Sequence, residues 1–340
     1  MPSAPSDADL GQAAGPLFTV VIPVYNKAPH VKRCLDSVLA QTEPRFEIVA
    51  VDDASTDGSG DILAGCADPR LTILRRPAPG PGASPARNLA IAHAQAPWLA
   101  FLDADDAWQP RHLEMIVRAW HAQGDDIGCV FAQYESVYPD GRREADPFSR
   151  LPASRRAGRL DFAAYLEAWL DTGESPMCSS TAAIRTAVMR QAGGFPERGC
   201  ERGEDKDTWL RIMARTVAAA SGYVGAAYHR DSVNMITNRA PECREHCIAP
   251  TVRALVAASR NRREIRLLKR INNLETLNLA KSVSRARPLT VSVFRHFYVL
   301  ASPIWFILIC GMWLVPARKG SRLRRWIAAV IKRPKRGGTT

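Results

Sequence analysis

Acidic residues are absent from the chain after Glu275, although the 340 residues contain 34 of them. Thirteen of the 46 lysines and arginines lie beyond that point, so residues 1–275 hold 33 basic against 34 acidic residues. The formal net charge of +12 therefore comes from the last part of the chain. This distribution excludes a broad basic face built for nucleic acid. It favours the attraction of a basic tail to an anionic membrane surface.

Other missing features bear on where the protein acts. Residues 1–16 have no basic start and no long apolar core, so we expect a flexible leader and not a secretory signal. The eight cysteines are scattered, which indicates reduced thiols in the cytoplasm. Cys243, His246 and Cys247 are close enough in sequence to suggest zinc, but no second ligand pair lies at finger spacing. The alternative for these three is a solvated helix.

Charge is also absent from residues 297–315, a stretch about long enough to cross a bilayer as a helix. Residues 323–333 resemble a basic amphipathic helix of the kind that lies in a membrane interface. Basic residues flank the apolar stretch on both sides, and a single span would place one group against the positive-inside tendency. We expect a re-entrant or in-plane attachment with both ends in the cytoplasm. The alternatives are a single span and a soluble core helix.

Strands and helices alternate along the first half of the chain. This rhythm predicts an α/β fold with a right-handed, mainly parallel central sheet. We expect strands at 18–25, 46–53, 71–76, 98–104 and 127–137, and helices at 28–41, 59–66, 86–95 and 111–123. Later segments predict helices at 161–171, 186–195 and 204–215, strands at 179–185 and 217–228, and helical structure from 241 to 282. The expected units are a domain at 17–240, a helical extension at 241–284 and a membrane-associated tail at 285–340.

Three acidic clusters occur in order: Asp52-Asp53, the run from Asp103 to Asp106, and Glu204-Asp205. The first two follow short apolar segments. Side chains just past the carboxyl ends of parallel strands converge at one edge of the sheet, where ligands bind. Several carboxylates close together repel one another unless a cation binds them or a substrate donates hydrogen bonds to them. The pattern predicts a nucleotide and a divalent metal at one edge, with one carboxylate left for proton chemistry.

Asp103 and Asp105 are two residues apart, so in an extended segment their side chains point the same way. Both can then address one Mg²⁺ or Mn²⁺, since such ions prefer hard oxygen ligands. The alternative is that the acids cap the helix expected from 111. Glu204 and Asp205 have a similar alternative, because acids in the first turn of a helix are favoured by its dipole.

Six motifs appear in the order that is typical of family 2 glycosyltransferases. They are VVIPVYN (20–26), VDDASTDGS (51–59), SPARN (84–88), FLDADD (101–106), GGFPE (193–197) and GEDKDTWLR (203–211). Over about residues 17–235 the chain resembles an inverting, metal-dependent GT-A glycosyltransferase of the bacterial cell-surface polysaccharide type. The resemblance implies a nucleotide-sugar donor, with UDP as the usual nucleotide, and Mg²⁺ or Mn²⁺ as cofactor.

The resemblance also implies roles for individual residues. The donor would be bound by Pro23, Tyr25, Asn26, Asp52, Asp53, Arg87 and Asp103, with Asp53 at the base. Asp105 would be the direct metal ligand, with Asp103 at the ribose or the metal and His229 as a further ligand. Asp205 would be the general base, and Glu204 would orient its loop or contact the acceptor. The alternatives are an Asx turn at Asp53, an ion pair between Arg87 and an aspartate, and an ordinary loop residue at His229.

These expectations describe an enzyme that transfers a sugar to a hydroxyl of a glycan or lipid-linked acceptor, attached by its tail to the cytoplasmic face of the inner membrane. A polyprenyl-phosphate glycosyltransferase is an alternative, because Arg198, Arg202 and Lys206 could bind an acceptor phosphate. A sugar nucleotidyltransferase is more remote, because it usually needs a glycine-rich basic loop after the first strand, and residues 25–27 are a poor match.

Overall fold

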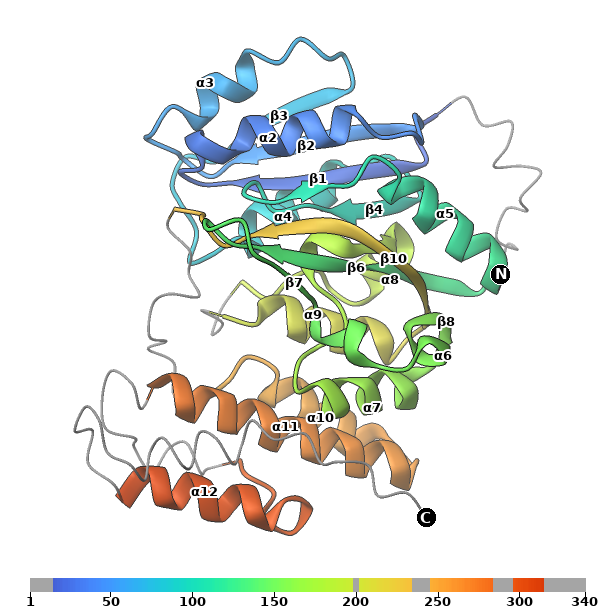
Figure 1. Ribbon diagram of the computed structural model, residues 1–340, viewed down its shortest axis with the longest axis vertical. Coiled ribbons are helices and arrows are strands. Elements are labelled where there is room, and N and C mark those ends of the chain that lie inside the picture. Colours follow the sequence, from blue (N-terminus) through green and yellow to red (C-terminus); the bar gives the residue numbers. More distant parts are fainter. Residues whose placement is uncertain (1–14, 198–201, 234–244, 284–295, 315–340) are drawn as a thin grey trace.

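A mixed β-sheet forms the centre of the protein (Figure 1). The structure is a computed structural model, and it describes residues 15–197, 202–233, 245–283 and 296–314. Within these residues the sheet contains ten strands, eight of them in the order β3-β2-β1-β4-β9-β6-β10-β5. The remaining two are edge additions: β7 (Arg143–Ala145) pairs with β6, and β8 (Ala157–Leu160) pairs with β10.

The first half of the sheet agrees with the sequence-based prediction. Four parallel strands alternate with helices: β1 (Phe18–Val24), α2 (Ala28–Leu39), β2 (Phe46–Asp52), α3 (Ser59–Ala64), β3 (Leu71–Arg75), α4 (Ser84–His93) and β4 (Trp98–Phe101). Strand β4 ends three residues earlier than expected. The chain leaves the sheet there, and this exit forms the loop that carries Asp103 and Asp105.

The second half of the sheet is mixed, and the expectation of a mainly parallel sheet is wrong there. Strand β9 (Ala182–Arg185) lies between β4 and β6 (Ile127–Val137) and is antiparallel to both. Strand β10 (Val217–His229) is parallel to β6 but antiparallel to the short β5 (Ala107–Trp108). Because β9 is buried on both faces, its apolar sequence reads the same in either direction and cannot reveal its orientation.

Helices cover both faces of the sheet. On one face α2, α3 and α5 (His112–Gln123) pack on alternate strand residues such as Val20 and Ile22. On the other face α4, α7 (Phe162–Thr172), α8 (Thr186–Gln191) and α9 (Glu204–Met213) pack on the intervening residues, such as Val21. This alternation follows from the two-residue period of a strand. Three short helical turns lie between β7 and β9: η1 (Pro147–Arg150), α6 (Ala153–Arg156) and η2 (Ser179–Thr181).

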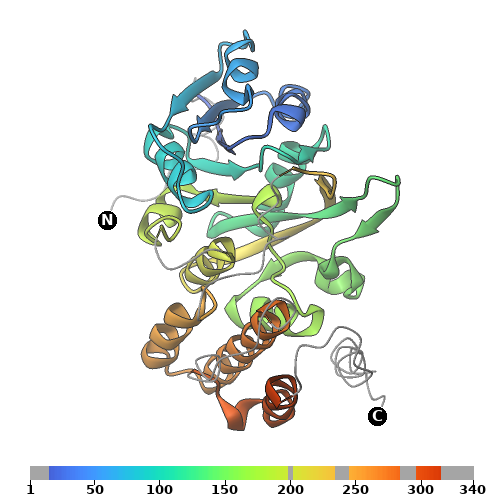
Figure 2. The ribbon, with the colours of Figure 1, turned by 90° about the vertical axis from the view of Figure 1, so that its left-hand side faces the viewer.

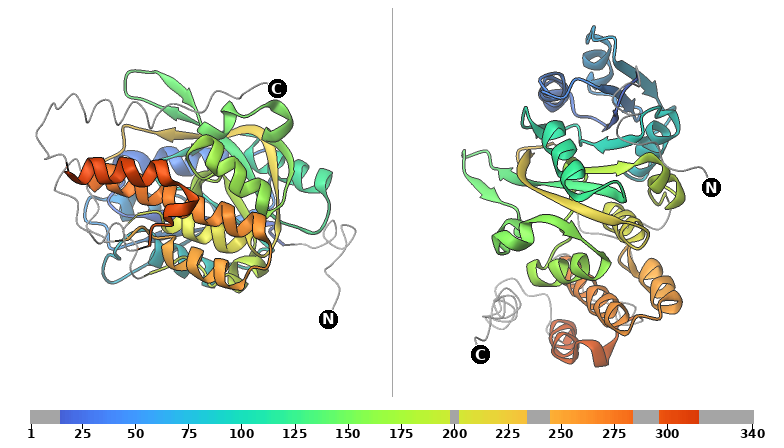
Figure 3. Two further views of the ribbon diagram at one scale, coloured as in Figure 1. Left: turned by 90° about the horizontal axis from the view of Figure 1, so that it is seen from below. Right: turned by 90° about the vertical axis from the view of Figure 1, so that its right-hand side faces the viewer.

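The helical extension packs against the second of these layers. Below the sheet, helix α11 (Arg262–Val283) lies beside α7, and α10 (Ala249–Ala258) packs on α11 and α9 (Figure 2). Leu268 and Ile271 of α11 share one apolar core with α7 and α9. Helix α12 (Pro303–Leu314), preceded by η5 (Val299–Ala301), lies along α11 (Figure 3). The expected boundary at residue 240 lies outside the described residues.

The tail is only partly described. Helix α12 contains twelve residues of the apolar stretch, and among the described residues no helix is long and apolar enough to span a bilayer. The amphipathic helix expected at 323–333 lies outside the described residues, as do the leader up to residue 14 and Cys243 of the suggested zinc cluster. Cys247 takes part in a disulfide bond, so the expectation of reduced thiols is wrong for this residue.

Candidate active site

Asp106 shapes the loop that follows β4. Its carboxylate is 1% exposed and accepts hydrogen bonds from Oγ of Ser180 at 2.5 Å and from the backbone N–H of His229 at 3.0 Å. Burial raises the pKa of Asp106 well above its ordinary value, and Asp105 and Asp103 raise it further. Ser180 precedes β9 and His229 ends β10. Asp106 therefore holds the loop after β4 next to these two later strands.

Arg87, in helix α4, joins two of the three acidic clusters. Its Nη2 lies 2.6 Å from Oδ1 of Asp103, and its Nη1 lies 3.1 Å from Oε1 of Glu204. The side chain is 4% exposed, and its guanidinium carbon lies 5.0 Å from the ring centre of Phe195. Burial alone would lower the pKa of Arg87, but Asp103 and Glu204 raise it above the ordinary value. The expected alternative of an ion pair with an aspartate is therefore observed, and it brings the β4 exit and α9 together.

Asp205 lies in the first turn of α9, next to Glu204. Burial, followed by the nearby charge of Glu204, raises the pKa of Asp205 to about 6, while Lys206 and Arg87 oppose this shift. Its Oδ1 accepts a hydrogen bond from the backbone N–H of Lys206 at 2.7 Å. A carboxyl with a pKa near the working pH is suited to accept a proton from an attacking group.

The first acidic cluster is already paired with arginines that the sequence analysis did not single out. Asp52 lies 3.0 Å from Nη2 of Arg75, and Asp53 pairs with Arg76 and accepts a hydrogen bond from the backbone N–H of Gly80 at 3.0 Å. Asp52 and Asp53 are 1% and 4% exposed. The sequence did hold a hint of these pairs. Arg75 and Arg76 end the third predicted strand, and that strand pairs with the second one, which ends at Asp52 and Asp53. A base bound at Asp53 would share that carboxylate with Arg76 or replace it.

The loop after β1 is fixed by hydrogen bonds. Asn26 has a positive φ of 51°, its Oδ1 accepts from the backbone N–H of Thr56 at 2.8 Å, and its own N–H donates to Oγ of Ser55 at 3.0 Å. Tyr25 is 44% exposed, and Pro23 lies within β1 beside Val51. Asn26 therefore ties the β1 loop to the β2 loop, while the Tyr25 ring stays available to a ligand.

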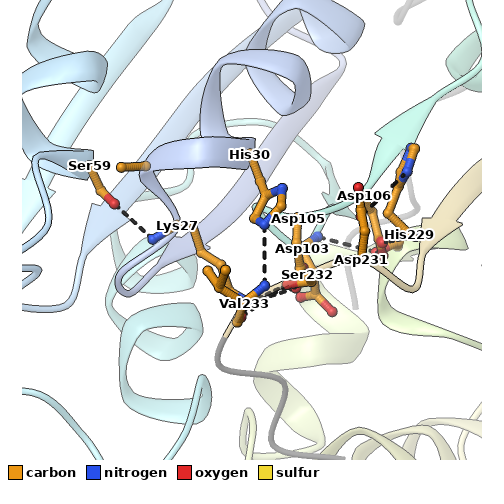
Figure 4. Close-up of polar contacts among 12 residues, drawn as sticks. Lys27, His30, Ser59, Asp103, Asp105, Asp106, His229, Asp231, Ser232 and Val233 are labelled. Atoms are coloured by element: carbon orange, nitrogen blue, oxygen red, sulfur yellow. Dashed lines mark hydrogen bonds and ion pairs between the residues drawn. The ribbon is translucent and has the colours of Figure 1, made fainter. Parts of the chain in front are cut away.

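Lys27 contacts the predicted metal ligand directly. Its Nζ lies 2.6 Å from Oδ2 of Asp105, and Oγ of Ser232 lies 2.5 Å from the same carboxylate oxygen (Figure 4). Neither Lys27 nor Ser232 was singled out from the sequence. Lys27 gave no signal because it stands at the start of a helix, and Ser232 gave none because it lies beyond the last of the six motifs, which ends at Arg211.

The carboxylate oxygens of Asp103 and Asp105 suit a hard divalent cation. Both residues supply carboxylate oxygens, and their side chains are 28% and 18% exposed. No group of three or more His, Cys, Asp or Glu side chains gathers at one point among the described residues, so His229 does not join the two aspartates. Its Nδ1 lies 3.9 Å from Asp231. The fit is that of a cation held by one or two carboxylates plus substrate phosphates, as is common for Mg²⁺.

The fold is that of the GT-A class of sugar-transferring enzymes. The chain superposes on Staphylococcus aureus TarS 1–349 in complex with UDP-GlcNAc with a TM-score of 0.63, 17% identity and coverage of 87% of this chain and 88% of that one. It also superposes on the mannosyltransferase PcManGT of Pyrobaculum calidifontis in complex with GDP-Man and Mn²⁺, with a TM-score of 0.53, 19% identity and coverage of 94% and 87%.

Sequence comparison places the chain more narrowly. Residues 19–191, just over half of it, match the profile of glycosyl transferase family 2, and the protein belongs to that family. It is 43% identical over 100 residues to the succinoglycan biosynthesis protein ExoW of Rhizobium meliloti (strain 1021), covering 28% of this chain and 31% of that one. It is 30% identical over 142 residues to chondroitin synthase of Pasteurella multocida (strain Pm70), covering 41% and 14%. The matches thus span less than a third of either relative.

Proposed function

We propose that the protein transfers a sugar from a nucleotide-diphosphate sugar to a hydroxyl group of a glycan or lipid-linked acceptor, with inversion at the anomeric carbon. The observation that carries this proposal is the guanidinium of Arg87, which holds Asp103 and Glu204 on its two nitrogens and places Asp205 beside them. One site then contains both a donor-side carboxylate and a carboxylate whose pKa of about 6 suits a base.

The residues divide the reaction between them. Asp205 accepts the proton of the acceptor hydroxyl while the acceptor oxygen attacks the anomeric carbon. The bond from that carbon to the diphosphate oxygen breaks on the opposite face, and the nucleoside diphosphate leaves. Arg87 keeps Glu204 and Asp103 in place and adds positive charge near the departing diphosphate. Tyr25 and Asp53 lie at the loops where the base and ribose would bind.

A divalent cation at Asp103 and Asp105 would act as a Lewis acid and offset the charge of the leaving diphosphate. Mn²⁺ is present with GDP-Man in PcManGT, which supports this assignment. UDP is our first choice of nucleotide because TarS was solved with UDP-GlcNAc, and GDP and dTDP are the other candidates. The names of ExoW and chondroitin synthase support a role in polysaccharide synthesis.

An acceptor hydroxyl fits the site better than an acceptor phosphate. A phosphate acceptor would need basic side chains free beside Asp205. Lys206 is instead engaged, because its Nζ lies 3.0 Å from Oε2 of Glu275, a residue of α11 that is 7% exposed. Arg202 donates to Ser282 at 3.4 Å, and Arg198 lies outside the described residues. Membership of family 2 argues against the nucleotidyltransferase reading.

We further propose that the protein works at the cytoplasmic face of the membrane. Four apolar side chains at η5 and the start of α12 face solvent: Val299, Leu300, Ile304 and Ile307 are 41%, 99%, 66% and 67% exposed. Thirteen basic residues follow Glu275 in the sequence. An apolar patch combined with basic residues suits attachment in the plane of an anionic bilayer.

Asp205→Asn tests the proposed base. We expect transfer to fall by at least about a thousandfold, since the amide cannot accept the proton. Binding of the donor, measured by thermal stabilisation with a panel of UDP-, GDP- and dTDP-sugars and Mn²⁺, should stay as in the wild type. Above pH 6 the variant should unfold at the same or a higher temperature, because the raised pKa of Asp205 makes its ionised form unfavourable in the folded state.

Asp207→Asn is the matched control in the same helical turn. Asp207 pairs with Arg211 at 2.8 Å and is 5% exposed. Its replacement should therefore lower the unfolding temperature, while the folded enzyme keeps its turnover. Retention of full turnover in Asp205→Asn would remove Asp205 as the base.

A further inference from the structure

Lys27 occupies a fully satisfied position beside Asp105. A lysine ammonium has three N–H donors, and all three find acceptors here. They are Oδ2 of Asp105 at 2.6 Å, Oγ of Ser232 at 2.7 Å and the backbone oxygen of Val233 at 2.8 Å (Figure 4). The side chains of Lys27 and Asp105 are only 14% and 18% exposed. These three oxygen acceptors form a binding site for a cation, and the Lys27 ammonium occupies it.

Lys27 belongs to a row of side chains at three-residue spacing on the first turns of α2. His30 Nε2 accepts a hydrogen bond from the backbone N–H of Val233 at 3.2 Å. Arg33 Nη2 donates to the backbone oxygen of Asp105 at 2.7 Å. The three side chains therefore form hydrogen bonds with two segments, the loop after β4 and the residues that follow β10.

A divalent cation at Oδ2 of Asp105 would compete with Lys27 for that oxygen. The carboxylate oxygen nearest to Lys27 also accepts the Ser232 hydroxyl, so its lone pairs are used. Mg²⁺ binds carboxylate oxygens at about 2.0–2.1 Å, and positive charges so close together repel strongly at a half-buried position. Entry of the metal at this oxygen would move the ammonium away, and the bonds from Lys27 to Ser232 and Val233 would break with it.

We propose that Lys27 is a resident counter-ion that the divalent cation displaces from Asp105, and that this displacement loosens the segment Asp231–Val233 after β10. The inference rests on the proposed metal site at Asp105. It makes Lys27 a positioning residue that sets the metal affinity of the protein before any donor is bound.

Titration of Mn²⁺ into the donor-free, full-length protein by calorimetry tests the proposal. Lys27→Met keeps the length of the side chain and removes its charge, so Mn²⁺ should bind about tenfold more tightly or better. Lys27→Arg keeps the charge and should bind Mn²⁺ as the wild type does. The matched control is Lys32→Met in the same helix. Lys32 is 74% exposed, and among the described residues its one ion pair is with Asp36, so its removal should leave the affinity unchanged.

The loosening of the segment has a separate readout. In hydrogen exchange measured by mass spectrometry, the peptide containing Val233 should exchange faster in the wild type after Mn²⁺ is added without donor. In Lys27→Met it should exchange faster already without the metal. Unchanged or slower exchange of this peptide on addition of Mn²⁺ to the wild type would overturn the release.

Two further variants keep the outcomes distinct. Asp105→Ala should lose Mn²⁺ binding. If it does, and Lys27→Met binds Mn²⁺ no more tightly than the wild type, the role of Lys27 is wrong while the metal site stands. If neither the wild type nor Lys27→Met binds Mn²⁺, both proposals fall. Should Lys27→Met not fold, Ser232→Ala removes one of the three acceptors, and an unchanged Mn²⁺ affinity in that variant would then overturn the proposal.

Discussion

Individual residues in the site are paired with partners of opposite charge. Asp53 lies against Arg76, Asp105 against Lys27, and Arg87 between Asp103 and Glu204. Asp205 differs from these residues: among the described residues it forms no salt bridge, and its Oδ1 accepts a hydrogen bond from the backbone N–H of Lys206. Its pKa of about 6 agrees with its proposed use as a base.

The pH dependence of transfer follows from Asp205. Its pKa is raised from 3.8 to about 6, mainly by burial, so the ionised form that accepts a proton appears only as the pH rises through that value. We therefore expect kcat/KM to increase with pH, with a midpoint near 6, and to level off above it. A profile measured between pH 4.5 and 8 with saturating Mn²⁺ checks this.

Glu204→Gln provides the internal control for that profile. Glu204 is the second cause of the raised pKa, after burial, so its neutralisation should move the midpoint to lower pH. A midpoint that stays in place in Glu204→Gln, or a wild-type profile that falls with rising pH, would contradict the assignment of Asp205.

Among the secondary-structure elements, α4 and the loop after α8 are joined by one asparagine. Asn88 Nδ2 donates to the backbone oxygen of Phe195 at 2.9 Å, and the Phe195 N–H donates to Asn88 Oδ1 at 2.8 Å. Gly194 passes beside this pair with φ +70°, and a Cβ added there would lie 2.7 Å from Asn88 Oδ1. The SPARN and GGFPE motifs thus form one joint, which holds Arg87 and Phe195 in contact.

Gly194→Ala tests this joint. The left-handed backbone disfavours alanine by about 1–2 kcal/mol, and the contact with Asn88 should add to that loss of stability. Gly193→Ala is a close control, because Gly193 has φ +82° but a Cβ there meets nothing within 4 Å. In urea unfolding we expect Gly194→Ala to be the less stable of the two. Equal stabilities would show that the joint tolerates the extra atom.

For the whole molecule, the extension ties the site to the proposed membrane face. Lys206, next to Asp205, pairs with Glu275 of α11, and Trp169 Nε1 of α7 lies 3.3 Å from the same carboxylate. Helix α12 in turn packs on α11 through Leu277 and Ile309. The site and the exposed apolar patch are therefore connected through packed helices.

Membrane binding is predicted to depend on the exposed patch. Replacing Leu300, Ile304 and Ile307 together by serine should reduce co-sedimentation with phosphatidylglycerol vesicles at least about tenfold, since each buried aliphatic side chain contributes roughly 1.5–3 kcal/mol. Ile73→Ser is the control, because Ile73 on β3 is also 39% exposed but lies far from α12 in the sequence. Undiminished binding of the triple variant would leave the basic tail alone as the attachment.

Much of the fold was predictable because strand and helix periods are local. Strand 127–137 was predicted to the residue, and β1 to β3 within one residue. The short strands β5, β7 and β8 were missed, because two to four residues carry no periodic signal. The roles assigned to the site residues from the motifs remain predictions, although Asp103, Arg87 and Glu204 do meet in space.

The sequence by itself determined the family, the alternating first half of the sheet and the acids at the strand ends, since these depend on local patterns and ordered motifs. Only the tertiary structure decided the antiparallel insertion of β9, the bridge made by Arg87 and the pairing of Lys27 with Asp105. Lys27 and Asp105 are 78 residues apart, and Arg87 and Glu204 are 117 apart. Charges at such separations find their partners only when the packed chain brings them together.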